Sequence, residues 1–160
     1  MTAVLVMGVS GCGKTTVAAG VAGHLGWTLL EGDVFHPAAN VAKMAAGTPL
    51  TDDDRWPWLR AIAAEASRHD RCVIACSALK RSYRAVIGAD VLVFLDGTKA
   101  LIGERLRARK GHFMPPALLD SQFATLEPPG DDEHPIVVPI DPPPSALIRA
   151  IVARLGEFSS

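Results

Sequence analysis

The residues from Gly8 to Thr15 have the types and the spacing needed to bind a phosphate chain. Gly8 is followed by four residues and then by Gly13, Lys14 and Thr15, which fits the P-loop pattern at every fixed position. Glycines permit the tight turn and let backbone N–H groups approach a phosphate, and a helix that begins near Lys14 adds its positive end. In such a loop the lysine reaches the β- and γ-phosphates, and the threonine hydroxyl can be a ligand of Mg²⁺.

The segments on either side of this loop favour a real phosphate site. The apolar run Ala3–Met7 has the composition of a buried strand, and Thr16–Leu25 carries apolar residues at helical spacing. A dinucleotide-binding glycine pattern does not fit, because Gly11 and Gly13 are followed by Thr16 where a third small residue is needed. The sequence therefore predicts a nucleotide-binding protein, and a glycine-rich turn without a ligand is the less favoured alternative.

Acidic residues follow the second expected strand. Trp27–Leu30 reads as a strand, and Glu31 and Asp33 come directly after it, at the edge of the sheet where open α/β folds bind ligands. An acidic turn around Gly32 is the alternative. A second acidic group, Asp52–Asp54, follows Thr51; we expect it to complement the N-terminus of a helix capped by that threonine rather than to bind a metal.

Basic residues follow the third and fourth expected strands. After the strand Arg71–Cys76, the side chains of Lys80, Tyr83 and Arg84 share one helix face, which suits an anionic ligand or is a solvated surface. The fourth strand, Val91–Leu95, ends at Asp96, which is either a Walker B acid or part of a strand-ending turn.

The segment from about residue 105 to residue 127 has the composition of a lid. A helix capped by Thr98 carries Arg105 and Arg109 on one face, and a Gly- and Pro-bounded excursion, Lys110–Pro116, precedes a further helix, Ala117–Leu126. Arginines that lead into such an excursion predict a mobile lid over phosphates. An ordinary surface helix and loop is the alternative.

The whole chain predicts one α/β domain over residues 1–160. Strands and helices alternate up to a last strand, Ile136–Ile140, and a final helix that is capped by Asp141 and runs to about Leu155. Pro139 indicates an edge strand or the strand's end. This order predicts a mostly parallel sheet with helices on both faces. The net charge of −1 gives no reason to expect a nucleic acid or an anionic membrane as a partner.

The three cysteines and the N-terminus bear on location. Cys12, Cys72 and Cys76 fit no zinc pattern and cannot all pair, so we expect reduced thiols in a cytoplasmic protein. The apolar N-terminus is short and has no basic leader, so we expect neither a signal peptide nor a membrane span. Because Cys12 lies inside the phosphate loop, sensitivity to thiol oxidation is a further hypothesis.

Blocks that run from Gly8 to about Glu127 resemble gluconokinases of the small P-loop, thermoresistant type. The blocks are Gly8–Thr15, Glu31–Asp33 with His36 and Pro37, Asn40 with Lys43 and Met44, Asp52–Arg55 with Pro57–Leu59, Cys76–Lys80 with Tyr83 and Arg84, Arg109–Phe113, Leu118 with Leu119, Ser121–Phe123, and Thr125–Glu127. The resemblance implies ATP- and Mg²⁺-dependent phosphorylation of D-gluconate at its 6-hydroxyl, which feeds the pentose phosphate or Entner–Doudoroff routes. It also implies a three-layer P-loop fold like adenylate and shikimate kinases, with a five-stranded sheet and a moving lid, and often a homodimer.

The resemblance also suggests roles for individual residues. Lys14, Asp33 and Arg109 would be catalytic, with Asp33 as the general base; Thr15 would bind Mg²⁺ directly and Glu31 through water. The ATP site would comprise Gly8, Val9, Ser10, Gly11, Cys12, Gly13, Lys14, Thr15, Thr16, Arg105 and Arg109. The gluconate site would comprise Asp33, His36, Arg55, Lys80, Tyr83, Arg84, His112 and Gln122, with Arg55, Lys80 and Arg84 at the carboxylate.

Two rival functions remain at this point. One is a different small-molecule kinase, such as one that acts on shikimate or a nucleoside monophosphate. The other is a nucleotide-dependent switch or binding module.

Overall fold

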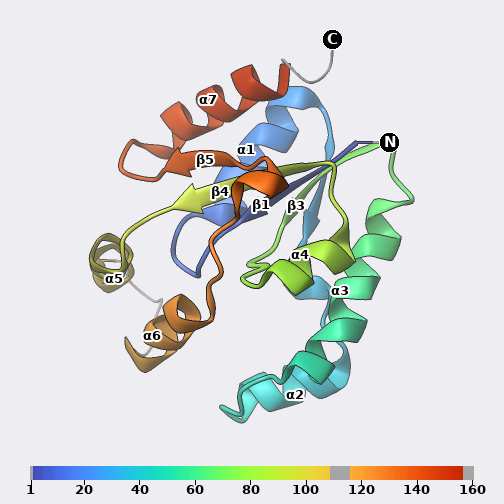
Figure 1. The fold of residues 1–160 in the computed structure, drawn as a ribbon, viewed down its shortest axis with the longest axis vertical. Coiled ribbons are helices and arrows are strands. Elements are labelled where there is room, and N and C mark those ends of the chain that lie inside the picture. The colour runs from blue at the N-terminus through green and yellow to red at the C-terminus, as the bar shows by residue number, and fades with distance from the viewer. Residues whose placement is uncertain (1, 109–115, 157–160) are drawn as a thin grey trace.

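Five parallel strands form one sheet in the computed structural model, which describes residues 2–108 and 116–156 (Figure 1). The strands are β1 (Thr2–Met7), β2 (Thr28–Glu31), β3 (Arg71–Ala75), β4 (Val91–Asp96) and β5 (Ile136–Pro139). Their order is β2-β3-β1-β4-β5, so the strand that precedes the glycine-rich loop lies in the middle. The predicted five-stranded parallel sheet is confirmed, and Pro139 does close an edge strand, opposite Asp96.

Seven helices connect and cover the strands in the described residues. They are α1 (Lys14–Leu25), α2 (Ala38–Ala45), α3 (Asp52–Ala66), α4 (Arg81–Ile87), α5 (Lys99–Ala108), α6 (Pro116–Thr125) and α7 (Pro144–Gly156). Two short 3₁₀ helices, η1 (Gly32–Phe35) and η2 (Asp131–Glu133), were not expected from the sequence. None of the helices in these residues is long and apolar enough to cross a bilayer.

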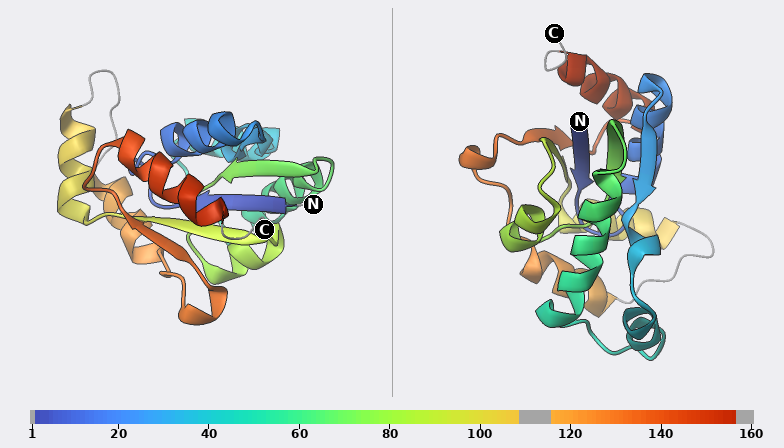
Figure 2. Two further views of the ribbon diagram at one scale, coloured as in Figure 1. Left: turned by 90° about the horizontal axis from the view of Figure 1, so that it is seen from above. Right: turned by 90° about the vertical axis from the view of Figure 1, so that its right-hand side faces the viewer.

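Alternate side chains of β1 face two separate apolar cores. Val4 and Val6 belong to a core that includes residues of α1 and α7, whereas Leu5 and Met7 belong to one that includes residues of α3 and α4. All four are at most 1% exposed. Because successive side chains of a strand point to opposite faces, one apolar run supplies both cores. Figure 2 shows the resulting layers, with α1 packed along α7 on one face of the sheet.

Three helix starts test the expected caps. Thr51 and Asp54 form a reciprocal capping box at α3, and Thr98 accepts a hydrogen bond from the N–H of Leu101 at the start of α5. The expected cap at Asp141 is wrong, because α7 begins only at Pro144. A residue before proline is disfavoured in helical conformation, so the run of prolines holds the chain extended until the last of them takes the first helical position.

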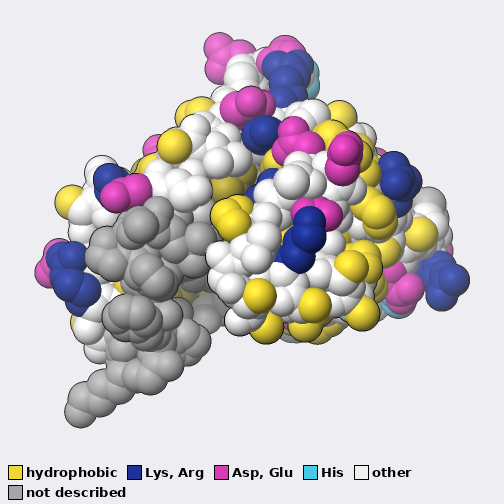
Figure 3. Space-filling model, turned by 90° about the horizontal axis from the view of Figure 1, so that it is seen from below, with side chains coloured by type: hydrophobic (Ala, Val, Ile, Leu, Met, Phe, Trp, Pro, Cys, Tyr) yellow, Lys and Arg dark blue, Asp and Glu magenta, His cyan; other side chains and the backbone are white. Residues whose placement is uncertain are grey.

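The face of the molecule seen from below in Figure 1 carries both signs of charge. Figure 3 shows Lys and Arg side chains interspersed there with Asp and Glu and with apolar groups, among the described residues. Among the described residues, no broad area of positive charge is visible on this face.

Candidate active site

The functional candidates gather where the strands end. The glycine-rich loop follows β1, Glu31 ends β2, and the loop that leads to Lys80 follows β3, so parallel pairing brings all three to one edge of the sheet. This is the edge at which open α/β sheets bind ligands. The clustering predicted from the sequence is therefore a consequence of the strand order.

The loop from Gly8 to Thr15 presents an open helix N-terminus. Gly13 precedes α1 with φ of +93°, and no side chain caps the helix, so the N–H groups of its first turn are available to an anion. Lys14 Nζ donates a hydrogen bond to the carbonyl of Val9 at 3.3 Å, folded back over the loop. Gly8 has φ of +155°, and a Cβ there would meet Cys12 Sγ at 2.7 Å. These are the features that a phosphate-binding loop requires.

A cavity of about 440 Å³ lies beside this loop. Its walls come from the loop and α1, from Arg105 in α5, and from residues 141–144 before α7. Arg105 Nη2 donates to the carbonyl of Ile140 at 2.6 Å, which ties α5 to that last wall. Most of the lining residues are apolar or glycine, with Thr16, Arg105 and Asp141 as the polar ones, and the volume is in the range of small-molecule sites.

Cys12 lies in the same loop but is poorly placed for redox chemistry. Its side chain is 2% exposed, and burial raises the pKa of the thiol, an effect that the nearby Lys14 charge offsets only in part. The thiolate is the reactive form, so these surroundings count against the oxidation hypothesis.

Glu31 lies against the hydroxyl that is expected to bind metal. Thr15 Oγ1 donates to Glu31 Oε2 at 3.3 Å. The other carboxylate oxygen, Oε1, is buried without a hydrogen-bond partner among the described residues. A buried carboxylate oxygen without a donor is costly, and a hydrated cation would satisfy it. The described residues contain no cluster of three His, Cys, Asp or Glu side chains that could hold a metal ion.

Asp33 extends from the short helix η1 into solvent. Its side chain is exposed, and no described residue forms a hydrogen bond or ion pair with it. The backbone beneath it is firmly held, because Trp58 Nε1 donates to the carbonyl of Gly32 at 2.7 Å. A Cβ on Gly32 would lie 2.7 Å from the carbonyl of Ala75, so only glycine permits this approach of η1 to β3. The backbone at Asp33 is thus held in place, whereas its carboxylate has no partner among the described residues.

His36 is held in one orientation, and its hydrogen bond to Asn40 selects one tautomer of the neutral ring. Its ring stacks on Trp58, with centroids 4.1 Å apart and planes 14° apart. Asn40 Nδ2 lies 3.2 Å from His36 Nδ1 and also donates to the carbonyl of Asp54 at 2.9 Å. Nδ1 is therefore the acceptor, and the proton is on Nε2. Burial lowers the pKa of His36, although the charge of Asp33 opposes this shift.

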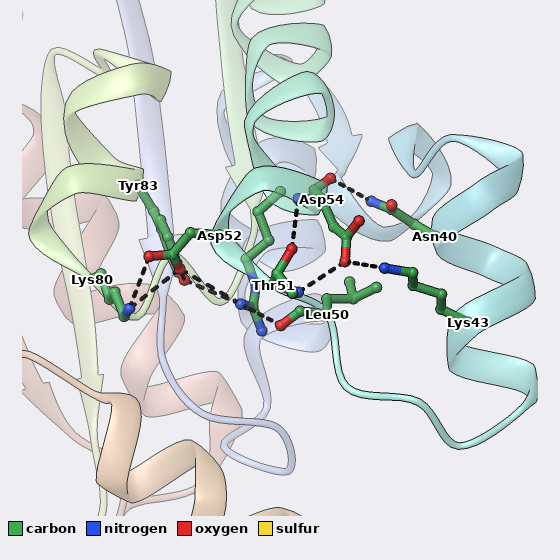
Figure 4. Close-up of polar contacts among 9 residues, drawn as sticks. Asn40, Lys43, Leu50, Thr51, Asp52, Asp54, Lys80 and Tyr83 are labelled. Carbon is green, nitrogen blue, oxygen red and sulfur yellow. Dashed lines mark hydrogen bonds and ion pairs between the residues drawn. The ribbon is translucent and has the colours of Figure 1, made fainter.

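Arg55, Lys80 and Tyr83 do lie together, around the carboxylate of Asp52. Figure 4 shows Lys80 and Tyr83 directed toward Asp52. Tyr83 donates to Asp52 Oδ1 at 2.5 Å, and Lys80 Nζ donates to both oxygens of Asp52 at 3.2 and 3.3 Å. Arg55 Nη1 donates to the Tyr83 hydroxyl at 3.2 Å. The hydrogen bonds from Tyr83 and Lys80 hold the pKa of Asp52 below its usual range. We call Asp52, Arg55, Lys80 and Tyr83 the basic cluster.

The sequence does not identify Asp52 as a member of this cluster. Its position predicts one of three acids at a helix N-terminus, and only its spacing of three residues from Arg55 signals a pair. Asn40 and Trp58, which orient His36, carried no independent signal for that role.

Arg84 lies elsewhere, and this corrects the expectation that it binds the substrate. Its Nε and Nη2 donate to the two carboxylate oxygens of Glu133 at 2.8 and 3.1 Å. Its remaining N–H groups donate to the carbonyls of Ala78, Leu79 and Glu127. The side chain is 5% exposed, and its five donors all have protein acceptors, so none is left for a ligand carboxylate.

Gln122 is hydrogen-bonded to the phosphate loop. Its Oε1 accepts from the N–H of Ser10 at 2.7 Å, and its Nε2 donates to the Ser10 hydroxyl at 3.0 Å. The expectation that Gln122 binds a sugar hydroxyl stays a prediction, because the amide keeps one N–H and further acceptor capacity beside its contacts with the phosphate loop. The expected site residues Arg109 and His112 lie outside the described residues.

Comparison with known proteins gives this site a family. A family model described as an AAA domain matches residues 4–129. The gluconokinase of Gluconobacter oxydans is 48% identical over 156 residues, which cover 92% of this chain and 88% of that protein. The chain belongs to the gluconokinase family.

Solved structures agree with this family assignment. The crystal structure of a gluconokinase from Sinorhizobium meliloti is 43% identical and superposes with a TM-score of 0.90, over 98% of this chain and 94% of that one. The shikimate kinase of Aquifex aeolicus, at 13% identity and a TM-score of 0.64 over 99% and 98% of the two chains, shares the fold alone. The resemblance to gluconokinases seen in the sequence is confirmed, as is the shikimate kinase-like fold.

Proposed function

We propose that this member of the gluconokinase family transfers the γ-phosphoryl group of ATP to the 6-hydroxyl of D-gluconate. The observation that carries the proposal is the 48% identity to a gluconokinase over 92% of the chain. The phosphate loop and the basic cluster, which lie at one edge of the sheet, supply a donor half and an acceptor half for this reaction.

On the donor side, the loop N–H groups and Lys14 would hold the β- and γ-phosphates. The rest of the nucleotide would fill the 440 Å³ cavity, whose walls come from the loop, Arg105 and residues 141–144. Arg109 is proposed to meet the transferring group, as arginines do in phosphoryl transfer. Catalysis of this kind rests on positioning and charge neutralisation.

Thr15 and Glu31 fit a magnesium ion. The Thr15 hydroxyl would ligate it, and Glu31 would hold one of its waters, which would give the unpaired Oε1 a donor. When bound, Mg²⁺ neutralises charge on the β- and γ-phosphates.

On the acceptor side, Asp33 is proposed as the general base. The 6-hydroxyl oxygen bonds to the γ-phosphorus, the bond from that phosphorus to the bridging oxygen of ADP breaks, and the hydroxyl proton passes to the Asp33 carboxylate. Arg55 and Lys80 are proposed to bind the gluconate carboxylate. His36 would donate from Nε2 to a sugar hydroxyl, and Tyr83 would hold Asp52 and Arg55 in place.

An acceptor screen tests the proposal. The purified protein is incubated with ATP, Mg²⁺ and one acceptor at a time, and ADP release and 6-phosphogluconate are measured. We expect turnover on gluconate and slow hydrolysis without an acceptor. Turnover on shikimate or AMP but not on gluconate would identify a different small-molecule kinase, and acceptor-independent hydrolysis alone would indicate a switch protein.

The proposal extends to the domain organisation, the oligomeric state and the location of the protein. We infer a single kinase domain over residues 1–160 with a lid over about 105–127, a homodimer, and a cytoplasmic location. The three free thiols, all buried, support a reducing compartment. Light scattering on the purified protein tests the dimer directly.

A further inference from the structure

Gln122 pairs with both polar groups of one residue in the phosphate loop. Its amide oxygen accepts from the Ser10 N–H at 2.7 Å, and its amide nitrogen donates to the Ser10 hydroxyl at 3.0 Å. A planar amide that engages two groups of one partner fixes both its distance and its direction. Ser10 is half-buried, so the loss of this partner would leave its N–H without an acceptor.

The next residue of the phosphate loop, Gly11, is in close contact with α5. A Cβ on Gly11 would lie 2.8 Å from two atoms of the Leu106 side chain, in α5. Gly11 has φ of +87°, so the backbone there is both left-handed and in close contact with α5. Ser10 and Gly11, two consecutive residues of the phosphate loop, thus contact α6 and α5, respectively.

The segment that follows α6 holds the loop that carries the acceptor-side cation. The N–H of Glu127, five residues beyond Gln122, donates to the carbonyl of Leu79 at 2.8 Å. The Glu127 carboxylate accepts from the N–H of Arg81 at 2.9 Å, in the first turn of α4. These contacts flank Lys80, which belongs to the basic cluster.

The loop between β3 and α4 contains a strained residue and is held by several hydrogen bonds. Ala78 has φ of 43°, a left-handed conformation that is strained for a residue with a Cβ. The carbonyls of Ala78 and Leu79 are held by Arg84, which also holds the carbonyl of Glu127. The position of Lys80 therefore depends on the same chain segment that reaches the phosphate loop through Gln122.

We infer that Gln122 and Glu127 are positioning residues that fix the donor loop and the acceptor loop relative to one another. Gln122 sets the phosphate loop through Ser10, and Glu127 sets Lys80 through the first turn of α4. The part that concerns the acceptor rests on the proposed function, whereas the part that concerns the donor rests only on the phosphate loop.

The first experiment separates the two Michaelis constants. Gln122→Met keeps the size of the side chain and removes its amide, so we expect KM for ATP to rise roughly 5- to 20-fold and KM for gluconate to stay within about 2-fold. Glu127→Ala should do the reverse, with KM for gluconate raised roughly 2- to 5-fold. Glu127→Gln should restore it, because the amide oxygen still accepts from the Arg81 N–H. Ser121→Ala, at an exposed position of α6, is the matched control.

A double-mutant cycle identifies the route. If Gln122 acts through Ser10, its replacement in a Ser10→Ala background should raise KM for ATP less than it does in the wild type, because one of the two hydrogen bonds is already gone. Calorimetric titration with ATP alone gives the same comparison without an acceptor, so it stands even if gluconate is not the substrate. Equal changes in both Michaelis constants, or a lower unfolding temperature with neither constant changed, would overturn the inference and leave a structural contact.

Discussion

Lys80 and Arg84 lie four residues apart at the start of α4, yet their charged groups have opposite surroundings. Lys80 Nζ reaches the half-exposed carboxylate of Asp52 at 3.2 Å, where a ligand can approach. Arg84 is buried against Glu133, with 2.8 Å between Nε and Oε1. Two basic side chains at one spacing can thus differ in function. Lys80 is accessible to a ligand, whereas Arg84 is buried beneath the loop that contains Ala78 and Leu79.

Lys80→Met is expected to weaken substrate binding with little effect on the fold. One charge-assisted hydrogen bond to a carboxylate is lost, so KM for gluconate should rise roughly 10-fold or more while KM for ATP stays near the wild-type value. Its pairing with Asp52 is solvent-accessible, and such pairs contribute little to stability. Steady-state kinetics measure the two KM values, and a thermal melt measures the stability of the variant. An unchanged KM for gluconate would remove Lys80 from the proposed site.

Arg84→Met is expected to destabilise the protein. It leaves the Glu133 carboxylate buried without its partner and frees the carbonyls of Ala78 and Leu79. Removal of one partner from a buried ion pair costs about 3–5 kcal/mol of the free energy of unfolding. Urea denaturation of the variant beside Arg60→Met, at an exposed position of α3, measures the difference. A variant of wild-type stability that fails to bind gluconate would restore the original expectation for Arg84.

Glu31→Gln is expected to raise the magnesium requirement. The change keeps the shape of the side chain beside Thr15 but removes the charge that would hold a metal-bound water. Loss of such an outer partner typically lowers metal affinity 10- to 100-fold, so the half-saturating Mg²⁺ concentration should rise by roughly that factor. Initial rates over a series of Mg²⁺ concentrations at fixed ATP give the half-saturating concentration. Glu104→Gln, at an exposed position of α5, is the control. An unaltered Mg²⁺ curve would argue against any contact of Glu31 with the metal.

Asp33→Asn tests the proposed base. The amide cannot accept the hydroxyl proton, so kcat should fall on the order of 10²-fold or more. The backbone of η1 is held by Gly32 and Trp58 rather than by the Asp33 side chain, so the fold should persist. Asp53→Asn, at an exposed position of α3, is the matched control and should keep nearly full activity. A near-normal kcat for Asp33→Asn would eliminate the general-base role.

The sheet and the phosphate loop were predictable because local signals specify them. Apolar runs bounded by glycine define the strands, and the spacing from Gly8 to Thr15 defines the loop without reference to the rest of the chain. Parallel pairing then fixes which strand ends meet. The same logic explains why the caps at Thr51 and Thr98 were found, since a cap is a contact within four residues.

The candidate site was only partly predictable, because the residues that pair with the expected site residues are distant in sequence. Arg84 and Glu133 are 49 residues apart, and Gln122 and Ser10 are 112 residues apart. Nothing local distinguishes an arginine that binds a substrate from one that supports a loop. Burial decides between them, and burial depends on how α6 and η2 pack against α4.

Lys43 and Asp54 give the protein an acid-sensitive contact at the start of α3. Lys43 Nζ donates to Asp54 Oδ2 at 2.7 Å, and the N–H of Thr51 donates to the same oxygen at 2.9 Å. These bonds lower the pKa of Asp54 from 3.8 to about 2, with the Lys43 bond as the larger cause.

The sign of this shift fixes its effect on stability. A carboxyl group with a lower pKa in the folded state stabilises the fold fully above its ordinary pKa and loses that contribution as the pH falls through the folded value. Lys43→Met should therefore be less stable than the wild type at neutral pH, and the difference should shrink as the pH falls from 3.8 toward about 2. Urea denaturation at a series of pH values measures it, with Arg60→Met for comparison. A difference that stays constant down to the lowest pH would show that Lys43 stabilises α3 by packing and not through the Asp54 carboxylate.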